Sequence, residues 1–296
     1  MSPRTAALAL ILLVVLSLLS RGLQERLRNF LIRRQAAVFL APLVLTLLFA
    51  GLAAWVGAFT WRLVLLAAAY LLIPTAIAFF QGAGPVNAPS ALDFAIIGIL
   101  WLPMEFAVAR TLVPRPAQGF LHTAAYGVAI LLALILFVCF RGWQGLKYRL
   151  PESRRDFLYA AAGFAASAPV LILIGRWIGF IPPFHLPAHP EPAWMAAHFL
   201  VILAATALPE EILFRSLIQN GLMRRYGANT AVLLVASLIF GCAHLNNGAQ
   251  NGLNWRYMIL ATIAGVAYGR VFQKSSSIWG SAALHALVDW TKHIFF

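Results

Sequence analysis

Long apolar runs recur along almost the whole chain and are separated by short polar stretches. The runs are continuous rather than alternating, and each has roughly the 20 residues that cross a bilayer as a helix. A lipid-facing backbone can pair its own polar groups only in a helix or a closed barrel. The pattern therefore predicts an all-α, polytopic integral membrane bundle with about eight to ten transmembrane helices. We place the spans near residues 5–20, 36–57, 62–80, 94–113, 119–140, 157–180, 195–218, 228–244, 257–273 and 277–294.

The composition indicates a membrane protein, and it also changes how the net positive charge is interpreted. Of the 296 residues, 62% are hydrophobic and only 10% are charged, whereas a soluble domain has about half and about a quarter. The net charge of +13 lies largely in arginines of short loops, as the positive-inside rule requires of a membrane protein. We therefore expect the lipid bilayer as a partner and no nucleic acid.

Two basic loops predict the orientation of the chain. Residues 21–35 and residues 141–156 each contain five basic side chains and should both be cytoplasmic. Four predicted spans separate them, so the two assignments agree and the N-terminus should lie outside. Polar residues within the spans become frequent after residue 156. We therefore divide the chain into a variable N-terminal transmembrane region, residues 1–156, and a core, residues 157–296.

The sequence PEEILFR, residues 209–215, puts two of the nine acids side by side in an apolar span. Ionisable groups inside a membrane are costly, so they are functional candidates. On an α-helix Glu210 and Glu211 point to different sectors, whereas Glu211 and Arg215 share a face. We predict that Glu211 pairs with Arg215 and that Glu210 is left as a general base, with Pro209 kinking or widening the helix. The alternative is an ion-paired helix end at the cytoplasmic interface.

Two further motifs lie on later predicted spans. In FGCAH, His244 ends a span, and Phe240 lies one turn before it on the same face, where it would wall a pocket. In HALVD, His285 and Asp289 are four residues apart, so they share a face and can bind a metal, or the acid can orient the imidazole. A structural histidine and a His–Asp bond that serves only packing are the alternatives.

Together the three motifs offer polar groups from three apolar helices to one cavity. Their order, EExxxR, FxxxH and HxxxD, resembles the CAAX prenyl protease type II and bacteriocin-processing family of intramembrane proteases. All three motifs are complete, and the resemblance covers residues 157–296. It implies an all-helical membrane fold, a protease core in this region, and hydrolysis of peptide bonds.

The resemblance also implies roles for the motif residues. Glu210 and His244 would activate a water molecule, and His285 and Asp289 would hold the oxyanion or help to position water. The supporting residues around them would be Glu211, Arg215 and Phe240.

Asp289 stands where the family has either asparagine or aspartate. Because an ionised aspartate repels an oxyanion, Asp289 must be protonated, orient His285 or bind a metal. Glu210, His244, His285 and Asp289 together would suit zinc. The family resemblance favours a metal-free glutamate mechanism, and the chain has no HExxH motif. We therefore expect a glutamate-dependent endopeptidase without a cofactor, and keep a divalent metal such as zinc as the alternative.

The expected substrate is a membrane-associated protein or peptide, and the expected location is a prokaryotic cytoplasmic (inner) membrane. The sequence identifies neither the substrate nor the oligomeric state. Two other functions use the same residues: a non-catalytic bacteriocin-immunity or scaffold protein, and a transporter or proton relay. Intact motifs favour the enzyme, because a lost Glu210 or His244 would be expected of a protein without catalysis.

Overall fold

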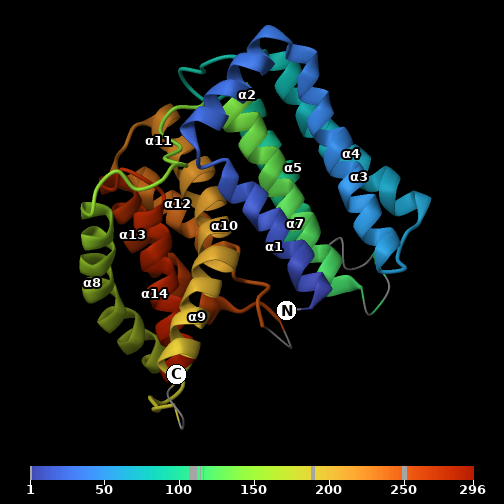
Figure 1. Ribbon diagram of the computed structural model, residues 1–296. Coiled ribbons are helices and arrows are strands. Elements are labelled where there is room, and N and C mark those ends of the chain that lie inside the picture. Colours follow the sequence, from blue (N-terminus) through green and yellow to red (C-terminus); the bar gives the residue numbers. More distant parts are fainter. Residues whose placement is uncertain (1, 107–111, 114, 116, 188–190, 249–251) are drawn as a thin grey trace. The chain divides into compact units, whose positions relative to one another are not determined.

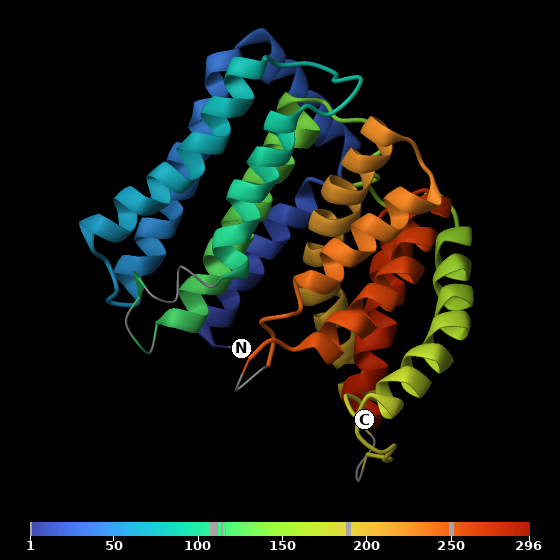
Figure 2. The same cartoon turned by 180° about the vertical axis from the view of Figure 1, so that it is seen from behind.

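The structure is a computed structural model and describes residues 2–106, 112–113, 115, 117–187, 191–248 and 252–296. Every regular element among these residues is a helix, which confirms the predicted all-α fold. The chain divides into two compact units, Met1–Leu146 and Lys147–Phe296. Figure 1 shows the order of the helices, and Figure 2 shows them from behind. The functional division at residue 156 stays a prediction.

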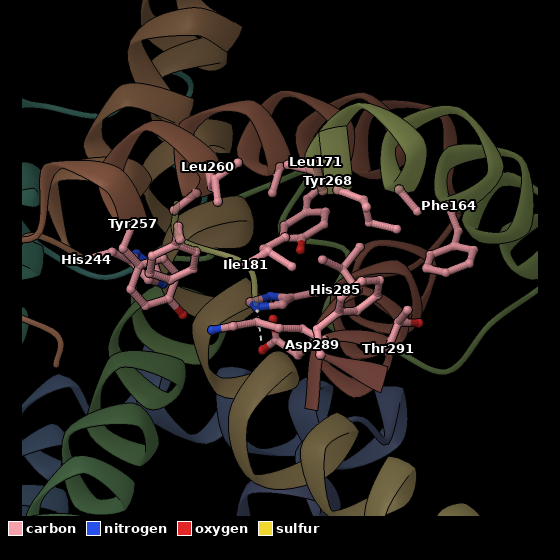
Figure 3. Close-up of a pocket in the computed structure, with 18 of the residues that line it drawn as sticks. Phe164, Leu171, Ile181, His244, Tyr257, Leu260, Tyr268, His285, Asp289 and Thr291 are labelled. Carbon is pink, nitrogen blue, oxygen red and sulfur yellow. Dashed lines mark ion pairs between the residues drawn. The ribbon is translucent and has the colours of Figure 1, made fainter. Parts of the chain in front are cut away.

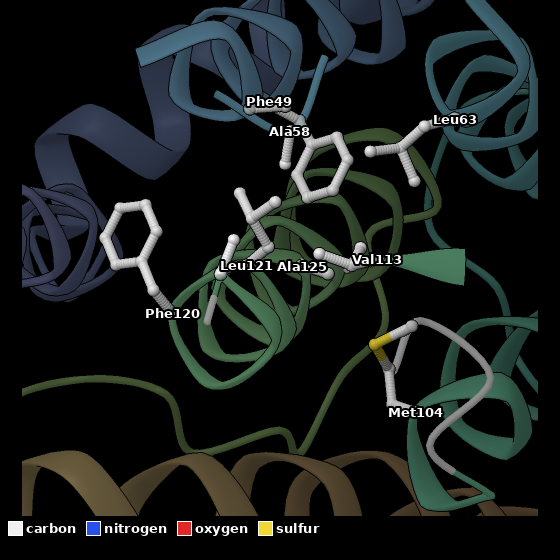
Figure 4. Packing of buried hydrophobic residues seen from close by; sticks show 10 residues of the cluster. Phe49, Ala58, Leu63, Met104, Val113, Phe120, Leu121 and Ala125 are labelled. Carbon is white, nitrogen blue, oxygen red and sulfur yellow. The ribbon is translucent and has the colours of Figure 1, made fainter. Parts of the chain in front are cut away.

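The first unit is an antiparallel arrangement of apolar helices. A hydrophobic cluster that includes Phe49, Leu63 and Leu121 joins three of them, α3, α4 and α7 (Figure 4). An 80° bend separates α1 from α2. The elements of this unit are α1 (Pro3–Ser17), α2 (Arg21–Arg33), η1 (Gln35–Phe39), α3 (Leu40–Trp55), α4 (Trp61–Gln81), α5 (Ala91–Glu105), α7 (Gln118–Leu134) and η2 (Ile135–Phe140).

A buried ion pair ties together the ends of α4, α5 and η2. Nε of Arg141 lies 3.1 Å from Oδ1 of Asp93. The same guanidinium donates to the carbonyls of Gln81 and Gly82, at 3.0 and 2.8 Å. Asp93 also accepts a hydrogen bond from the backbone N–H of Ser90 and so forms the capping box that starts α5. Arg141, which the sequence marked only as a loop charge, therefore holds this unit together.

The second unit contains all the predicted site residues. Its helices begin and end at residues suited to these positions. Gly227 ends one helix with a φ of 88°, and Asn229 caps the next by accepting from Val232 N at 2.9 Å. The elements are α8 (Arg155–Trp177), α9 (Pro192–Ile202), η3 (Leu203–Ala207), α10 (Leu208–Glu211), η4 (Ile212–Gln219), α11 (Asn220–Tyr226), α12 (Thr230–Cys242), α13 (Trp255–Lys274) and α14 (Trp279–Phe295).

Glycines bring α12 and α13 close together. A Cβ atom added at Gly269 would meet the side chain of Leu233, and it would lie 2.6 Å from Oε1 of Gln219. A Cβ atom at Gly241 would meet the side chain of Thr262. Small residues allow such close approach of membrane helices. Close contact with α13 therefore sets the position of the helix that carries the FGCAH motif.

The part of the chain that the structure describes has fewer full-length spans than the eight to ten that we predicted. Within it, five helices are long and apolar enough to cross a membrane, or six if the bent pair α1 and α2 is one span. Several predicted spans form shorter helices: α5 has 15 residues, α12 has 13 and α14 has 17. The apolar runs at α12 and α14 extend into turns beyond the helices, and the predicted span 94–113 includes residues 107–111, which lie outside the described residues. The five are Gln35–Trp55, Trp61–Gln81, Gln118–Phe140, Arg155–Trp177 and Pro192–Tyr226.

A buried carboxylate ties the start of α8 to the turn that precedes α14. Asp156 is only 1% exposed. It accepts hydrogen bonds from N and Oγ of Ser276, at 2.7 and 2.8 Å, and from N and Oγ of Ser277, at 3.1 and 2.6 Å. Four donors therefore surround one carboxylate, which fixes where α14 begins.

A lysine next to this carboxylate binds the end of α13. Nζ of Lys147 donates to the carbonyls of Phe272 and Ser275, both at 2.7 Å. A cation at a helix C-terminus satisfies its last carbonyls and complements its dipole. Burial lowers the pKa of Lys147, and the nearby charge of Asp156 opposes this shift. Lys147 and Asp156 together fix the positions of α8, α13 and α14 relative to one another at one end of the unit.

We expect Asp156→Asn to lower the free energy of unfolding by about 2–4 kcal/mol, because an amide cannot accept all four bonds and hydrogen bonds to charged groups are the strong ones. Unfolding in detergent, followed by circular dichroism, measures the loss. Glu152→Gln is the matched control: its carboxylate is half-exposed and pairs with Arg149 at 3.2 Å, so its loss should stay within about 0.5 kcal/mol. Equal effects of the two variants would contradict the role given to Asp156.

Candidate active site

The helix that carries both glutamates is 35 residues long, Pro192–Tyr226, and is not α-helical throughout. Two π-helical stretches, η3 and η4, flank the four residues of α10. Pro209 lies within α10 and has no N–H to donate, which interrupts a regular α-helical ladder. Turns of π-helix are common at functional sites. The helix is therefore widened around Pro209, one of the two outcomes that the sequence predicted.

Both glutamates lie near the same histidine of α14. Oε2 of Glu210 lies 3.9 Å from Nε2 of His285, and Oε1 of Glu211 lies 3.1 Å from Nδ1 of the same ring. Both residues belong to the four α-helical residues of α10. Their carboxylates approach opposite nitrogens of the ring, and Glu211 is fully buried whereas Glu210 is a quarter exposed, as expected of neighbours that point to different sectors of an α-helix.

Glu211 and Arg215 form a fully buried ion pair. Nε of Arg215 lies 3.2 Å from Oε2 of Glu211, and both side chains are 0% exposed. This is an ion pair by distance rather than a well-directed hydrogen bond, because these two atoms have no hydrogen-bond partner of good geometry. The guanidinium also faces the rings of Phe240 and Tyr268, 4.8 and 5.7 Å from their centroids. Cation–π contacts therefore replace part of the hydration that burial removes.

His285 is the centre of the cluster. Its Nδ1 is hydrogen-bonded to Glu211, and its Nε2 forms an ion pair with Oδ2 of Asp289 at 3.5 Å. The ring of Tyr268 stacks on the imidazole with a centroid distance of 4.6 Å. Carboxylates at both ring nitrogens favour the charged form of an imidazole. His285 is therefore held from three sides, in surroundings that favour a cationic ring.

His244 has a different environment and a different form. Its Nδ1 lies 2.8 Å from the carbonyl of Phe240, so Nδ1 must carry the proton and donate it. This tautomer leaves a lone pair on Nε2, which lies 4.0 Å from Oε2 of Glu210. The ring of Tyr257 meets the imidazole edge-on, with 4.5 Å between the centroids. The two histidines therefore offer opposite chemistry, an acceptor at His244 and a donor at His285.

A cavity of about 70 Å³ lies between α8, α12, α13 and α14, and it has room for a few water molecules (Figure 3). His244, His285 and Asp289 line it, as does Phe240, and the rest of its wall is mostly apolar. Glu210 is not among the lining residues, although its carboxylate reaches both imidazoles. The structure thus brings the catalytic candidates together, with Glu210 and Asp289 each about a quarter exposed.

Three residues around these groups lie outside the three motifs. Tyr257 and Tyr268 come from α13, which carries none of the three motifs, so no spacing pointed to them. Lys292 lines the cavity from α14. It follows His285 and Asp289 at positions i+7 and i+3, and this helical spacing is a signal that could have found it.

The residues proposed for zinc do not form a ready metal site. Among the described residues, no group of three or more His, Cys, Asp and Glu side chains is placed to hold a metal ion. Both ring nitrogens of His285 face carboxylates, so neither offers a free lone pair. The donor set therefore fits a hydrogen-bonded cluster better than a zinc site, and whether the protein takes a metal stays a prediction.

We expect Arg215→Ala to destabilise the protein by about 3–5 kcal/mol, because it leaves the carboxylate of Glu211 buried without its cation. Arg225→Ala on α11 is the control, since Arg225 is exposed. Unfolding in detergent compares the two variants. Adding Glu211→Gln to Arg215→Ala should recover part of the loss, because the stranded charge is removed. A stable Arg215→Ala variant would show that the ion pair is not needed for folding.

The comparisons with known proteins agree with the geometry. Residues 192–291 match the family model described as type II CAAX prenyl endopeptidase Rce1-like. The match begins at the start of α9 and includes the motif residues on α10, η4, α12 and α14 as well as His244. No curated protein and no solved structure gives a significant match. Residues 192–291, about a third of the chain, are therefore similar to the Rce1-like type II CAAX prenyl endopeptidases, the kind of protein that the three motifs resemble.

Proposed function

We propose that the protein is an intramembrane endopeptidase in which Glu210 and His244 activate a water molecule. The observation that carries the proposal is the gap of 4.0 Å between Oε2 of Glu210 and Nε2 of His244. Both atoms are hydrogen-bond acceptors in the arrangement described above. A water that donates one proton to each acceptor at ordinary lengths would hold them roughly 4–5 Å apart. The gap therefore suits a bridging water whose oxygen lone pairs remain available for attack.

The chemistry follows from this placement. The oxygen of the water bonds to the carbonyl carbon of the scissile peptide while Glu210 takes a proton from the same water. His244 keeps the water oriented. The carbonyl oxygen becomes an oxyanion, and the cationic ring of His285 is the nearest charge that can stabilise it. The proton held by Glu210 then passes to the leaving nitrogen as the C–N bond breaks. The water supplies the hydroxyl of the new carboxyl group and a proton of the new amine.

Asp289 acts on this mechanism through His285. Its carboxylate lies 3.5 Å from Nε2 of His285, so it orients the ring and favours its charged form. Glu211 does the same from Nδ1 while it is itself paired with Arg215. This assignment selects one of the three options left by the sequence, in which Asp289 orients His285 rather than contacting the oxyanion.

The substrate that we propose is a membrane-associated protein or peptide, and the location is a prokaryotic cytoplasmic membrane. The apolar lining of the cavity, formed by residues such as Leu171, Ile181 and Leu260, supports a substrate that is apolar near the cleaved bond.

We expect Glu210→Gln and His244→Ala each to lower cleavage at least about a hundredfold while the protein remains folded and inserted, since general base catalysis contributes this much or more. Quantitative mass spectrometry of protein termini in host-cell membranes compares each variant with the wild type. Glu105→Gln is the control: this acid also lies in an apolar helix, where it accepts from Trp101 at 3.1 Å, and its loss should leave cleavage unchanged. If the wild type and Glu210→Gln give the same termini at equal expression, a transporter or scaffold becomes the better explanation.

Removal of divalent metals should leave cleavage unchanged, because the proposed water is held by two side chains rather than by an ion. Purified protein is dialysed against a chelator, and its metal content and cleavage rate are measured together. Stoichiometric zinc that is lost along with activity, and that restores activity when added back, would replace this mechanism with a zinc-dependent one.

A further inference from the structure

Lys292 lies in the last turn of α14 and is part of the cavity wall. Among the described residues that line the cavity it is the one lysine or arginine. It follows His285 by seven residues and Asp289 by three, so all three lie on one face of the helix. A lysine in a last turn often serves only the helix dipole. This one, however, faces the site rather than the surrounding bilayer.

Aromatic rings hold the ammonium group in place. Nζ of Lys292 lies 4.7 Å from the centroid of Phe180 and 5.0 Å from that of Tyr257. These two rings stack on each other with 5.0 Å between their centroids. Tyr257 in turn packs against the imidazole of His244. The cation is therefore positioned by contacts that lead directly to the catalytic candidates, and a cation over aromatic faces stays charged at low cost.

With the three carboxylates ionised and the nearby His293 neutral, the charges of the site balance only when this cation is counted. The carboxylates are Glu210, Glu211 and Asp289. Arg215 offsets Glu211, and the doubly donating ring of His285 offsets one more. One negative charge remains without Lys292, in an apolar surrounding where an unbalanced charge is costly. The unbalanced negative charge would lie where the reaction must form an oxyanion. Two negative charges repel each other most strongly in an apolar surrounding.

We propose that Lys292 is a positioning residue of the site, whose ammonium offsets the carboxylate of Asp289 so that His285 can stabilise a developing oxyanion. The inference rests on the proposed function for its catalytic part. It also explains how this chain uses an aspartate at the end of the HxxxD motif: the charge that would repel an oxyanion is matched one turn further along the same helix.

The test uses four variants of the full-length protein: Lys292→Gln, Lys292→Arg, Asp289→Asn, and the double variant Lys292→Gln with Asp289→Asn. We expect Lys292→Gln to lower the yield of wild-type-specific termini about tenfold to a hundredfold. Lys292→Arg should keep most of the yield, because it keeps the charge. The double variant should recover at least about tenfold over Lys292→Gln, because it removes the excess negative charge and an amide oxygen still accepts from His285.

A second measurement does not depend on catalysis. The midpoint of thermal unfolding in detergent should fall for Lys292→Gln and rise again in the double variant. Lys274→Gln is the matched control, because Lys274 is an exposed lysine at the end of α13 and should change neither readout. A merely structural lysine would give a loss that Asp289→Asn does not repair.

The outcomes separate the inference from the proposed function. If Glu210→Gln leaves cleavage intact, the proposed function fails, and the unfolding midpoints alone decide whether Lys292 offsets Asp289. If Glu210→Gln abolishes cleavage but Lys292→Gln does not reduce it, the inference is wrong and the proposed function stands. A double variant that is no more active and no more stable than Lys292→Gln also overturns the inference.

Discussion

A carboxylate buried in an apolar helix bundle must meet a positive charge or lose its own, and this constraint organises the second unit. Glu211 meets it in two directions, through Arg215 on its own helix and through His285 on α14. Because these contacts join two helices, they fix the distance between the glutamate pair and the histidine. The remaining groups of the site, including His244 and the aromatic rings, are arranged around that fixed pair.

The glutamate pair in α10 shows how a short stretch of helix serves this constraint. Glu210 and Glu211 are adjacent in four α-helical residues between two π-helical stretches. Their carboxylates lie near opposite nitrogens of one imidazole. One glutamate is fully buried in an ion pair, while its neighbour keeps a quarter of its surface exposed. Two chemically identical residues, adjacent in sequence, therefore have different environments.

Much of this arrangement could be predicted from the sequence, and the parts that could not have physical reasons. Continuous apolar runs determine an all-helical membrane fold, and the i,i+4 spacings of Glu211 with Arg215 and of His285 with Asp289 predict the contacts that the structure contains. The number of full-length spans was overestimated, because hydropathy does not show where a helix ends within an apolar run. The contact of both glutamates with one histidine was not predicted, because it depends on how α10 and α14 pack, which no spacing within one helix shows.

Contacts between residues far apart in the sequence were the other omission. Tyr257 and Tyr268 belong to no motif, and their importance comes only from packing against the two histidines. Asp156 lies in a stretch that was used only to orient the chain in the membrane. Its four hydrogen bonds arise from a turn 120 residues later, which no local pattern reveals.

The tie made by Asp156 gives the two ends of the unit different kinds of contact. It joins α8 to the turn before α14 at one end of the unit through four polar bonds. At the other end, Phe184 only stacks against Phe295 and Phe296, with a single backbone bond from His185 to Phe295. The start of α8 is therefore joined to the turn before α14 by polar bonds, whereas the loop after α8 meets the end of α14 mainly through aromatic contacts.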